Sequence, residues 1–160
     1  RMIKIDHEVE LMRLAAKVTL TAYDAAYRAL NPGMTKPQLE EMVETAHTRL
    51  GFSGGADVQV GEYSAFPHGS VTPQVIREGA IVLMDGGGNV EGYASDITRT
   101  FVLGKPSDKM KTVFDIVHRA QTSALKTARP GLECQAVDAA ARAAPAICRR
   151  STLLIDVIRR

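Results

Sequence analysis

Apolar side chains recur at every third or fourth position from Asp6 to Leu30. This spacing is typical of an amphipathic helix with one buried face. The residues of the predicted buried stripe are Val9, Met12, Ala16, Leu20, Tyr23, Tyr27 and Leu30. We expect the helix to end at Asn31-Pro32-Gly33, because proline and glycine are strong helix terminators.

A second helix is predicted to begin at Thr35 and to end near Leu50, before Gly51. Thr35-Lys36-Pro37-Gln38 has the form of a capping box, in which the Gln38 side chain reaches back to the Thr35 amide. The first part of the chain is therefore expected to form two consecutive helices.

The pattern then changes to the alternation of β-strands. Residues 56–61 alternate like a strand, and residues 64–72 read as a loop that carries Phe66-Pro67-His68-Gly69. The apolar run 80–84 suits a buried strand, and the β-branched and aromatic residues of 93–103 predict its partner. Glu91-Gly92 is the predicted two-residue turn between them, with glycine supplying a positive φ.

Two more helices are predicted in the last third of the chain. Ser107 is the predicted cap of a helix that runs to Arg129 and ends at Pro130-Gly131. An alanine-rich helix follows from Cys134 to about Ala144. With no internal repeat and no low-complexity linker, we expect a single α+β unit with a small antiparallel sheet.

Composition narrows the classes of protein and partner. The 160 residues are 45% hydrophobic and 24% charged, which is typical of a soluble globular protein. A net charge of +2, spread along the chain, gives no reason to expect nucleic acid or a membrane as partner. No apolar run is long enough to span a bilayer, and no signal peptide is recognisable. Cys134 and Cys148 are too few for a disulfide framework, so we expect a reducing, cytoplasmic location.

Two aspartates are the main candidates for chemistry. Asp85 and Asp96 are separated by 96 − 85 = 11 positions, one at the end of the apolar strand and one in its partner. If Glu91-Gly92 forms the turn, Asp85 lies opposite Thr98, and Asp96 is a diagonal neighbour of Asp85 on the same face. A one-residue bulge would turn one of them to the other face.

Like charges at this spacing repel each other, and a divalent metal would offset that cost. The alternative is that the aspartates face solvent or pair with Arg99 or Lys105. The run Gly86-Gly87-Gly88 fits a close approach to a ligand, or a loosely formed strand end. His68 is either a cleft residue or a solvated imidazole, and the other histidines lie in predicted helices without metal-ligand spacing.

Three segments resemble Xaa-Pro aminopeptidases and Xaa-Pro dipeptidases (prolidases), whose "pita-bread" fold is shared with methionine aminopeptidase and creatinase. They are Ala65-Phe66-Pro67-His68-Gly69, the stretch from Glu78 to Gly87, and the stretch from Gly92 to Phe101, which contains Ser-Asp-Ile-Thr-Arg-Thr. The resemblance covers about residues 3–142 and implies an α+β chain that is the N-terminal half of a pita-bread fold. Residues 143–160 resemble nothing in the family.

The resemblance also implies the chemistry. Asp85 matches an aspartate that binds one metal ion, Asp96 matches one that bridges two, and His68 matches a histidine that contacts substrate. The family holds two divalent ions, with Mn²⁺ favoured here over Co²⁺ or Zn²⁺ by oxygen ligands. A hydroxide between the metals attacks the carbonyl before proline, so the expected substrate is a peptide with proline at its second position.

The family pattern has three further metal ligands, a histidine in Gly-His-Gly and two glutamates, but no histidine or glutamate follows Glu133 here. We therefore expect a truncated or frame-shifted chain that is inactive on its own and forms a homodimer across its exposed apolar surface. Two alternatives keep the fold: a non-catalytic module that binds peptide or a protein partner, and a creatinase-like enzyme without metal. The aspartate pair argues against the latter.

Overall fold

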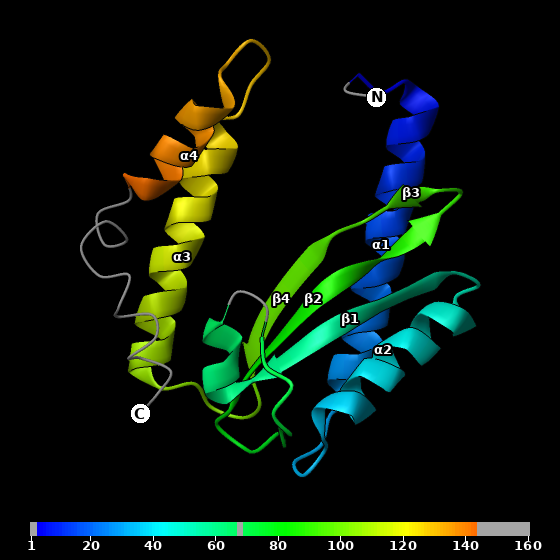
Figure 1. Cartoon of the computed structure of the whole chain (residues 1–160), viewed down its shortest axis with the longest axis vertical. Coiled ribbons are helices and arrows are strands. Elements are labelled where there is room, and N and C mark those ends of the chain that lie inside the picture. The colour runs from blue at the N-terminus through cyan, green and yellow to red at the C-terminus, as the bar shows by residue number, and fades with distance from the viewer. Residues whose placement is uncertain (1–2, 67–68, 144–160) are drawn as a thin grey trace. The chain divides into compact units, whose positions relative to one another are not determined.

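The computed structural model describes residues 3–66 and 69–143, which form two compact units divided at Lys105–Pro106 (Figure 1). The elements of the first unit are α1 (Asp6–Arg28), α2 (Lys36–Arg49), β1 (Ser53–Val60), the 3₁₀ turn η1 (Gly61–Ala65), β2 (Ile81–Val90), β3 (Tyr93–Ala94) and β4 (Ile97–Val102). The second unit contains α3 (Asp108–Thr127) and α4 (Cys134–Arg142). None of the described helices is long and apolar enough to cross a membrane.

The first unit contains an antiparallel sheet with β2 at its centre, between β1 on one side and β3 and β4 on the other. Val90 lies opposite Tyr93, so Glu91-Gly92 is the predicted two-residue turn. Both turn residues have positive φ, 51° and 86°, as a type I′ turn requires. The same register continues into β4, where Asp85 lies opposite Thr98 as predicted.

The strand boundaries differ from the predicted ones. Asp85 lies in the middle of β2 rather than at a strand end, because the glycine run after it continues the strand and pairs with residues 54–56 of β1. The predicted strand 93–103 is divided into β3 and β4 at Ser95-Asp96. β1 begins at Ser53, three residues earlier than predicted, since Gly54 and Gly55 are part of the ladder.

Both helices of the first unit pack on one face of the sheet, as expected for this α+β arrangement. α2 contacts β1, while α1 contacts β2 and β3. The strands turn alternate side chains toward these helices, and the fully or almost fully buried apolar ones are Val58, Val60, Val82, Met84 and Val90. The other face of the sheet carries no described helix of this unit.

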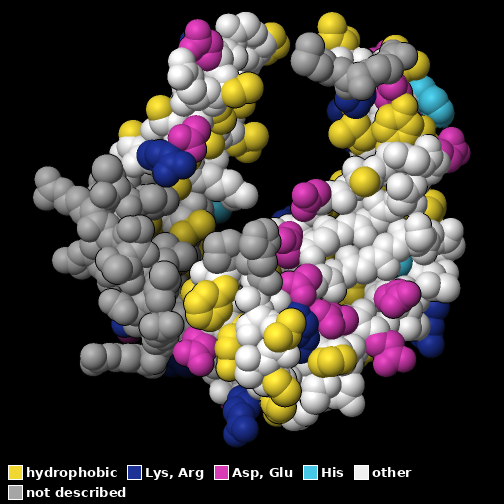
Figure 2. All heavy atoms as spheres, in the orientation of Figure 1, with side chains coloured by type: hydrophobic (Ala, Val, Ile, Leu, Met, Phe, Trp, Pro, Cys, Tyr) yellow, Lys and Arg dark blue, Asp and Glu magenta, His cyan; other side chains and the backbone are white. Residues whose placement is uncertain are grey.

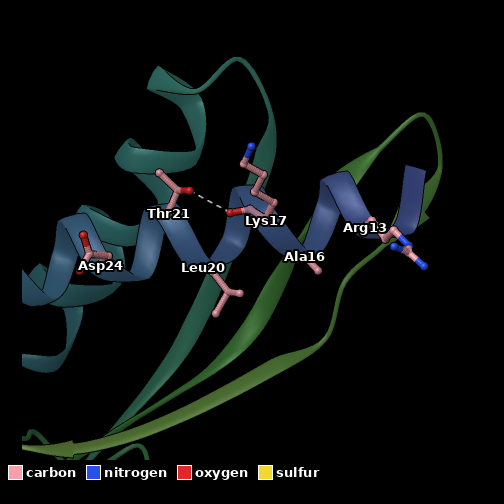
Figure 3. A pocket seen from close by; sticks show the side chains of 6 residues that line it. All are labelled: Arg13, Ala16, Lys17, Leu20, Thr21 and Asp24. Atoms are coloured by element: carbon pink, nitrogen blue, oxygen red, sulfur yellow. Dashed lines mark hydrogen bonds between the residues drawn. The ribbon is translucent and has the colours of Figure 1, made fainter. Parts of the chain in front are cut away.

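The buried face of α1 is not the predicted one. Tyr23 and Leu30 are buried as predicted, but Met12, Leu20 and Tyr27 are 40–48% exposed. The helix is buried instead along Leu11, Ala15, Val18, Ala22 and Ala26. Periodicity alone could not separate these two adjacent stripes. The small alanines allow close approach to the sheet, while Ala16 and Leu20 help to line a shallow surface pocket formed by α1 alone (Figure 3).

The predicted helix starts are confirmed. The Thr35 amide donates to Gln38 Oε1 (2.9 Å) and the Gln38 amide donates to Thr35 Oγ1 (3.4 Å), which completes the capping box of α2. Ser107 Oγ accepts from the Met110 amide at the start of α3. The ends of α1 and α3 lie about two residues earlier than predicted, a normal range for helix termini. The predicted end of α4 at Ala144 lies outside the described residues.

Side chains close the outer edge of β1. Glu40 Oε1 accepts from the Val58 amide (3.0 Å), and Gln74 Oε1 accepts from the Val60 amide (2.6 Å). Outward-facing amides at a sheet edge are a template for pairing with another chain. Glu40 and Gln74 therefore protect this edge of the sheet.

Candidate metal centre

The helix-free face of the sheet carries carboxylates. Asp57 on β1 lies opposite Asp85 on β2, and Asp85 lies opposite Thr98 on β4. Side chains alternate along a strand, so these three share the face opposite to Val58 and Met84. Their exposure agrees, since all three are exposed, as is Asp96. Figure 2 shows acidic side chains gathered on the sheet surface turned to the viewer.

Asp85 is oriented by its cross-strand neighbour. Thr98 Oγ1 donates a hydrogen bond of 2.5 Å to Asp85 Oδ1. This bond uses part of the acceptor capacity of one carboxylate oxygen and leaves Oδ2 open for a cation. A carboxylate held by a hydroxyl in this way is typical of metal sites, where outer contacts orient the ligand.

Asp96 lies in the break between β3 and β4, directly before β4. The Ser95 amide donates to the Gly88 carbonyl (2.9 Å), so β2 remains paired beside the break. The Ser95 carbonyl lies over Gly87, where a Cβ atom would be only 1.8 Å from that oxygen. The middle residue of the glycine run therefore permits the backbone path that leads into Asp96.

The electrostatics of Tyr23 place both aspartates in the same neighbourhood. Burial raises the pKa of the Tyr23 phenol, and the negative charges of Asp85 and Asp96 raise it further, against an opposing effect of Arg99. The Tyr23 hydroxyl donates to the Ile97 carbonyl (3.1 Å), next to Asp96. Asp85 and Asp96 thus act together on one buried hydroxyl, as expected for carboxylates that share one part of the sheet.

Asp57 is a carboxylate that the sequence analysis did not single out. Burial alone would raise its pKa, but hydrogen bonds from Lys36 and Gln59 outweigh burial and lower it. Lys36 Nζ lies 2.5 Å from Asp57 Oδ1, and Gln59 Nε2 donates to Oδ2 (2.7 Å). Each carboxylate oxygen of Asp57 therefore already has a protein partner. Only the β1–β2 register reveals its place opposite Asp85.

His68, the third predicted site residue, lies outside the described residues. Within residues 3–66 and 69–143, no group of three or more histidine, cysteine, aspartate or glutamate side chains is arranged to hold a metal ion. The two predicted ligands of the described part of the chain, Asp85 and Asp96, thus form an incomplete donor set on their own.

Comparison with known proteins identifies the family of the chain. Residues 10–147 match metallopeptidase family M24. The Xaa-Pro dipeptidase of Pyrococcus horikoshii is 32% identical over 145 residues, covering 89% of this chain and 41% of that protein. The probable dipeptidase PepE of Mycobacterium tuberculosis is 34% identical and is covered to 39%. The chain therefore spans about two fifths of the length of these relatives.

Solved structures show the same relation. The X-Pro aminopeptidase from Thermotoga maritima has a TM-score of 0.84 at 34% identity, with 89% of this chain and 41% of that one covered. The prolidase from Pyrococcus furiosus has a TM-score of 0.81 at 32% identity, with coverages of 89% and 43%. The described fold is that of the N-terminal portion of a pita-bread peptidase. On both the sequence and the structural match, the chain belongs to metallopeptidase family M24.

Proposed function

We propose that the chain supplies the first part of the active site of an Xaa-Pro exopeptidase, in which Asp85 and Asp96 bind divalent metal and His68 contacts the substrate. The observation that carries this proposal is the pair of exposed carboxylates on the helix-free face of the sheet, with Asp85 held by Thr98. The proposed substrate is a peptide with proline at the second position, as the names of the relatives suggest.

The donor chemistry fits a hard cation. Both proposed ligands are carboxylates, and oxygen ligands favour Mn²⁺ over softer metals. Divalent ions in such a site, when bound, polarise the scissile carbonyl and lower the pKa of a water. The residues of this chain would contribute in two ways. The Thr98 hydroxyl orients Asp85, and the backbone directly before β4 presents Asp96.

The proposal includes a homodimer. Two carboxylates alone bind a cation weakly, since affinity increases with the number of preorganised ligands. Exposed apolar side chains are available for self-association, among them Met12, Leu20 and Tyr27 on α1. A second copy would cover part of that surface. A monomer mass in solution at tens of micromolar would contradict this part of the proposal.

The proposal is tested by titrating the purified chain with Mn²⁺ and by measuring proline release from Xaa-Pro dipeptides and from a longer Xaa-Pro peptide. Mn²⁺ binding that Asp96→Asn weakens at least about tenfold would support the metal site. Asp24→Asn is the matched control, because Asp24 is an exposed aspartate of the same unit that pairs with Arg28 on α1. Equal binding by wild type and Asp96→Asn would exclude Asp96 as a ligand.

A second candidate function is a non-catalytic module that binds peptide. It is favoured by the incomplete donor set of the described residues. Binding of an Xaa-Pro peptide without proline release, in the presence of Mn²⁺, would support the module. Proline release that is abolished in Asp96→Asn would support the enzyme.

A further inference from the structure

A buried histidine far from the carboxylates in sequence is linked to the backbone beside one of them. His47 lies on α2, is 0% exposed and forms a hydrogen bond between Nε2 and Thr19 Oγ1 of α1 (3.2 Å). Thr19, also 0% exposed, lies 2.8 Å from Ser95 Oγ. Ser95 directly precedes Asp96. The three side chains form a continuous hydrogen-bonded chain from α2 through α1 to the break between β3 and β4.

The backbone groups at the two ends limit the possible directions of these hydrogen bonds. His47 Nδ1 lies 2.9 Å from the Val43 carbonyl, which can only accept, so Nδ1 carries a proton. If Nε2 accepts from the Thr19 hydroxyl, Thr19 Oγ1 accepts from the Ser95 hydroxyl, although Ser95 Oγ also lies 3.3 Å from the Gly88 carbonyl, to which it can donate instead. Ser95 Oγ accepts from the Gly88 amide at 2.9 Å. Each of these side chains is satisfied in this arrangement.

Two glycines provide the space for the imidazole. Gly54 and Gly88 lie opposite each other on β1 and β2. A Cβ atom at Gly54 would lie 2.4 Å from His47 Cδ2, and one at Gly88 would lie 3.1 Å from the same atom. The strands thus leave a hollow on the helix-covered face, and His47 fills it. A polar ring buried there requires hydrogen-bond partners, which the Val43 carbonyl and the Thr19 hydroxyl provide.

Ser95 connects these buried hydrogen bonds to Asp96, the proposed metal ligand. Its side chain is held on the helix side by Thr19, while its amide is held by the Gly88 carbonyl. Asp96 is joined directly to Ser95, so holding both the side chain and the amide of Ser95 restricts the backbone position of Asp96. At this position the regular ladder is interrupted, and the Ser95 side chain accepts from the Gly88 amide beside the remaining backbone bond.

We propose that His47 and Thr19 are positioning residues for Asp96, acting through Ser95. The inference rests on the proposed function in so far as Asp96 is a metal ligand. The structural part of the inference, that the hydrogen bonds among His47, Thr19 and Ser95 fix the backbone at Ser95-Asp96, does not depend on metal. Outer contacts of this kind, when removed, weaken metal binding by about 10- to 100-fold in characterised sites.

The test uses the whole chain and compares Thr19→Val with Thr19→Ser. Valine preserves the shape of threonine and removes the hydroxyl, whereas serine keeps the hydroxyl and removes a methyl group. We expect Thr19→Val to weaken Mn²⁺ binding by about tenfold and to shift the amide resonances of Ser95 and Asp96 in the metal-free protein. We expect Thr19→Ser to bind Mn²⁺ close to wild type and to keep those resonances. A role in packing alone would give the opposite order, because only serine leaves a cavity.

Two further variants keep the outcomes separable. Ser95→Ala removes the last hydroxyl at a half-buried site and tests the same link if Thr19→Val does not fold. Unchanged Ser95 and Asp96 resonances in folded Thr19→Val, or an unchanged Asp96 resonance in Ser95→Ala, would overturn the inference, whatever the metal affinity. Asp96→Asn separates the two proposals: if it binds Mn²⁺ as wild type does, the metal assignment fails, while the metal-free resonances still decide the positioning role.

Discussion

At the scale of single residues, Gly55 and Gly87 face each other across β1 and β2 but differ in their surroundings. A Cβ atom at Gly55 would have nothing within 4 Å, whereas one at Gly87 would be 1.8 Å from the Ser95 carbonyl. We expect Gly87→Ala to lower the free energy of unfolding by about 1–3 kcal/mol, because the backbone of the strand break must move. Urea unfolding measures this change.

Gly55→Ala is the matched control, since it makes the same substitution on the paired residue. We expect it to change the free energy of unfolding by less than about 1 kcal/mol, and to be stabilising if the unfolded chain loses conformational freedom. Equal losses for the two variants would show that the approach of Ser95 to Gly87 is not what requires glycine.

Asp57 gives a prediction for the pH dependence of stability. Hydrogen bonds from Lys36 and Gln59 hold its pKa below the ordinary 3.8. A carboxyl group whose pKa is lowered by folding stabilises the protein above its unfolded pKa, and this contribution is lost as the pH falls through the folded pKa. We therefore expect wild type to lose more stability than Asp57→Asn between about pH 5 and pH 3.

The measurement is thermal or urea unfolding of both proteins across that pH range. Asp24→Asn is a suitable control, because the exposed Asp24–Arg28 pair contributes little to stability. If Asp57→Asn and wild type lost stability in parallel on acidification, the contacts with Lys36 and Gln59 would not be formed in solution.

At the scale of elements, the outer edge of β1 depends on side chains of α2 and of the segment before β2. Glu40 Oε1 is the acceptor for the Val58 amide. We expect Glu40→Leu to cost about 1–2 kcal/mol and to promote association, because a sheet-edge amide loses its partner. Glu40→Gln keeps an oxygen acceptor and should retain most of the stability. Urea unfolding and light scattering distinguish the two variants, and equal behaviour would contradict the edge role of Glu40.

The pairing of β2 with β4 could be predicted from sequence, while that of β1 with β2 could not. Glu91-Gly92 fixes the register of the hairpin, so the position of Asp85 opposite Thr98 follows from counting. Residues 61–80 separate β1 from β2, and a connection of that length does not fix a register. For this reason Asp57 appears opposite Asp85 only in the structure.

The candidate site shows the same limit. Alternation along two strands was enough to predict that Asp85 and Asp96 share a neighbourhood. The hydrogen bonds that link His47 and Thr19 to Ser95 were not predictable. Thr19 and Ser95 are 76 positions apart in the sequence, and Thr19 and His47 are 28 apart. The buried stripe of α1 was predicted wrongly, since that helix carries apolar residues on two sides and only packing selects one.

At the scale of the whole molecule, burial is distributed unevenly. Among the described residues, every buried apolar side chain except Ala120 belongs to the first unit. On α3, Phe114, Val117 and Leu125 are 42–75% exposed. Segments with few buried apolar contacts open at a lower free-energy cost than the core.

We therefore expect amide hydrogens of α3 and α4 to exchange faster than those of β2. Native-state hydrogen exchange, followed by mass spectrometry, measures this difference. Raising the protein concentration is the control, because self-association that covers α3 would slow exchange there and leave β2 unchanged. Equal protection of α3 and β2 at low concentration would contradict this distribution of stability.

The hollow formed by Gly54 and Gly88 has a consequence for how the sequence can change over time. An alanine at position 54 would collide with the imidazole of His47 and also with the backbone carbonyl of Gly87, so a smaller residue at position 47 would remove only one of the two collisions. Glycine at position 54 is therefore constrained twice, by a side chain of α2 and by the backbone of the neighbouring strand β2. A change at position 47 relieves the first constraint and leaves the second, so the glycine outlasts the histidine that fills the hollow.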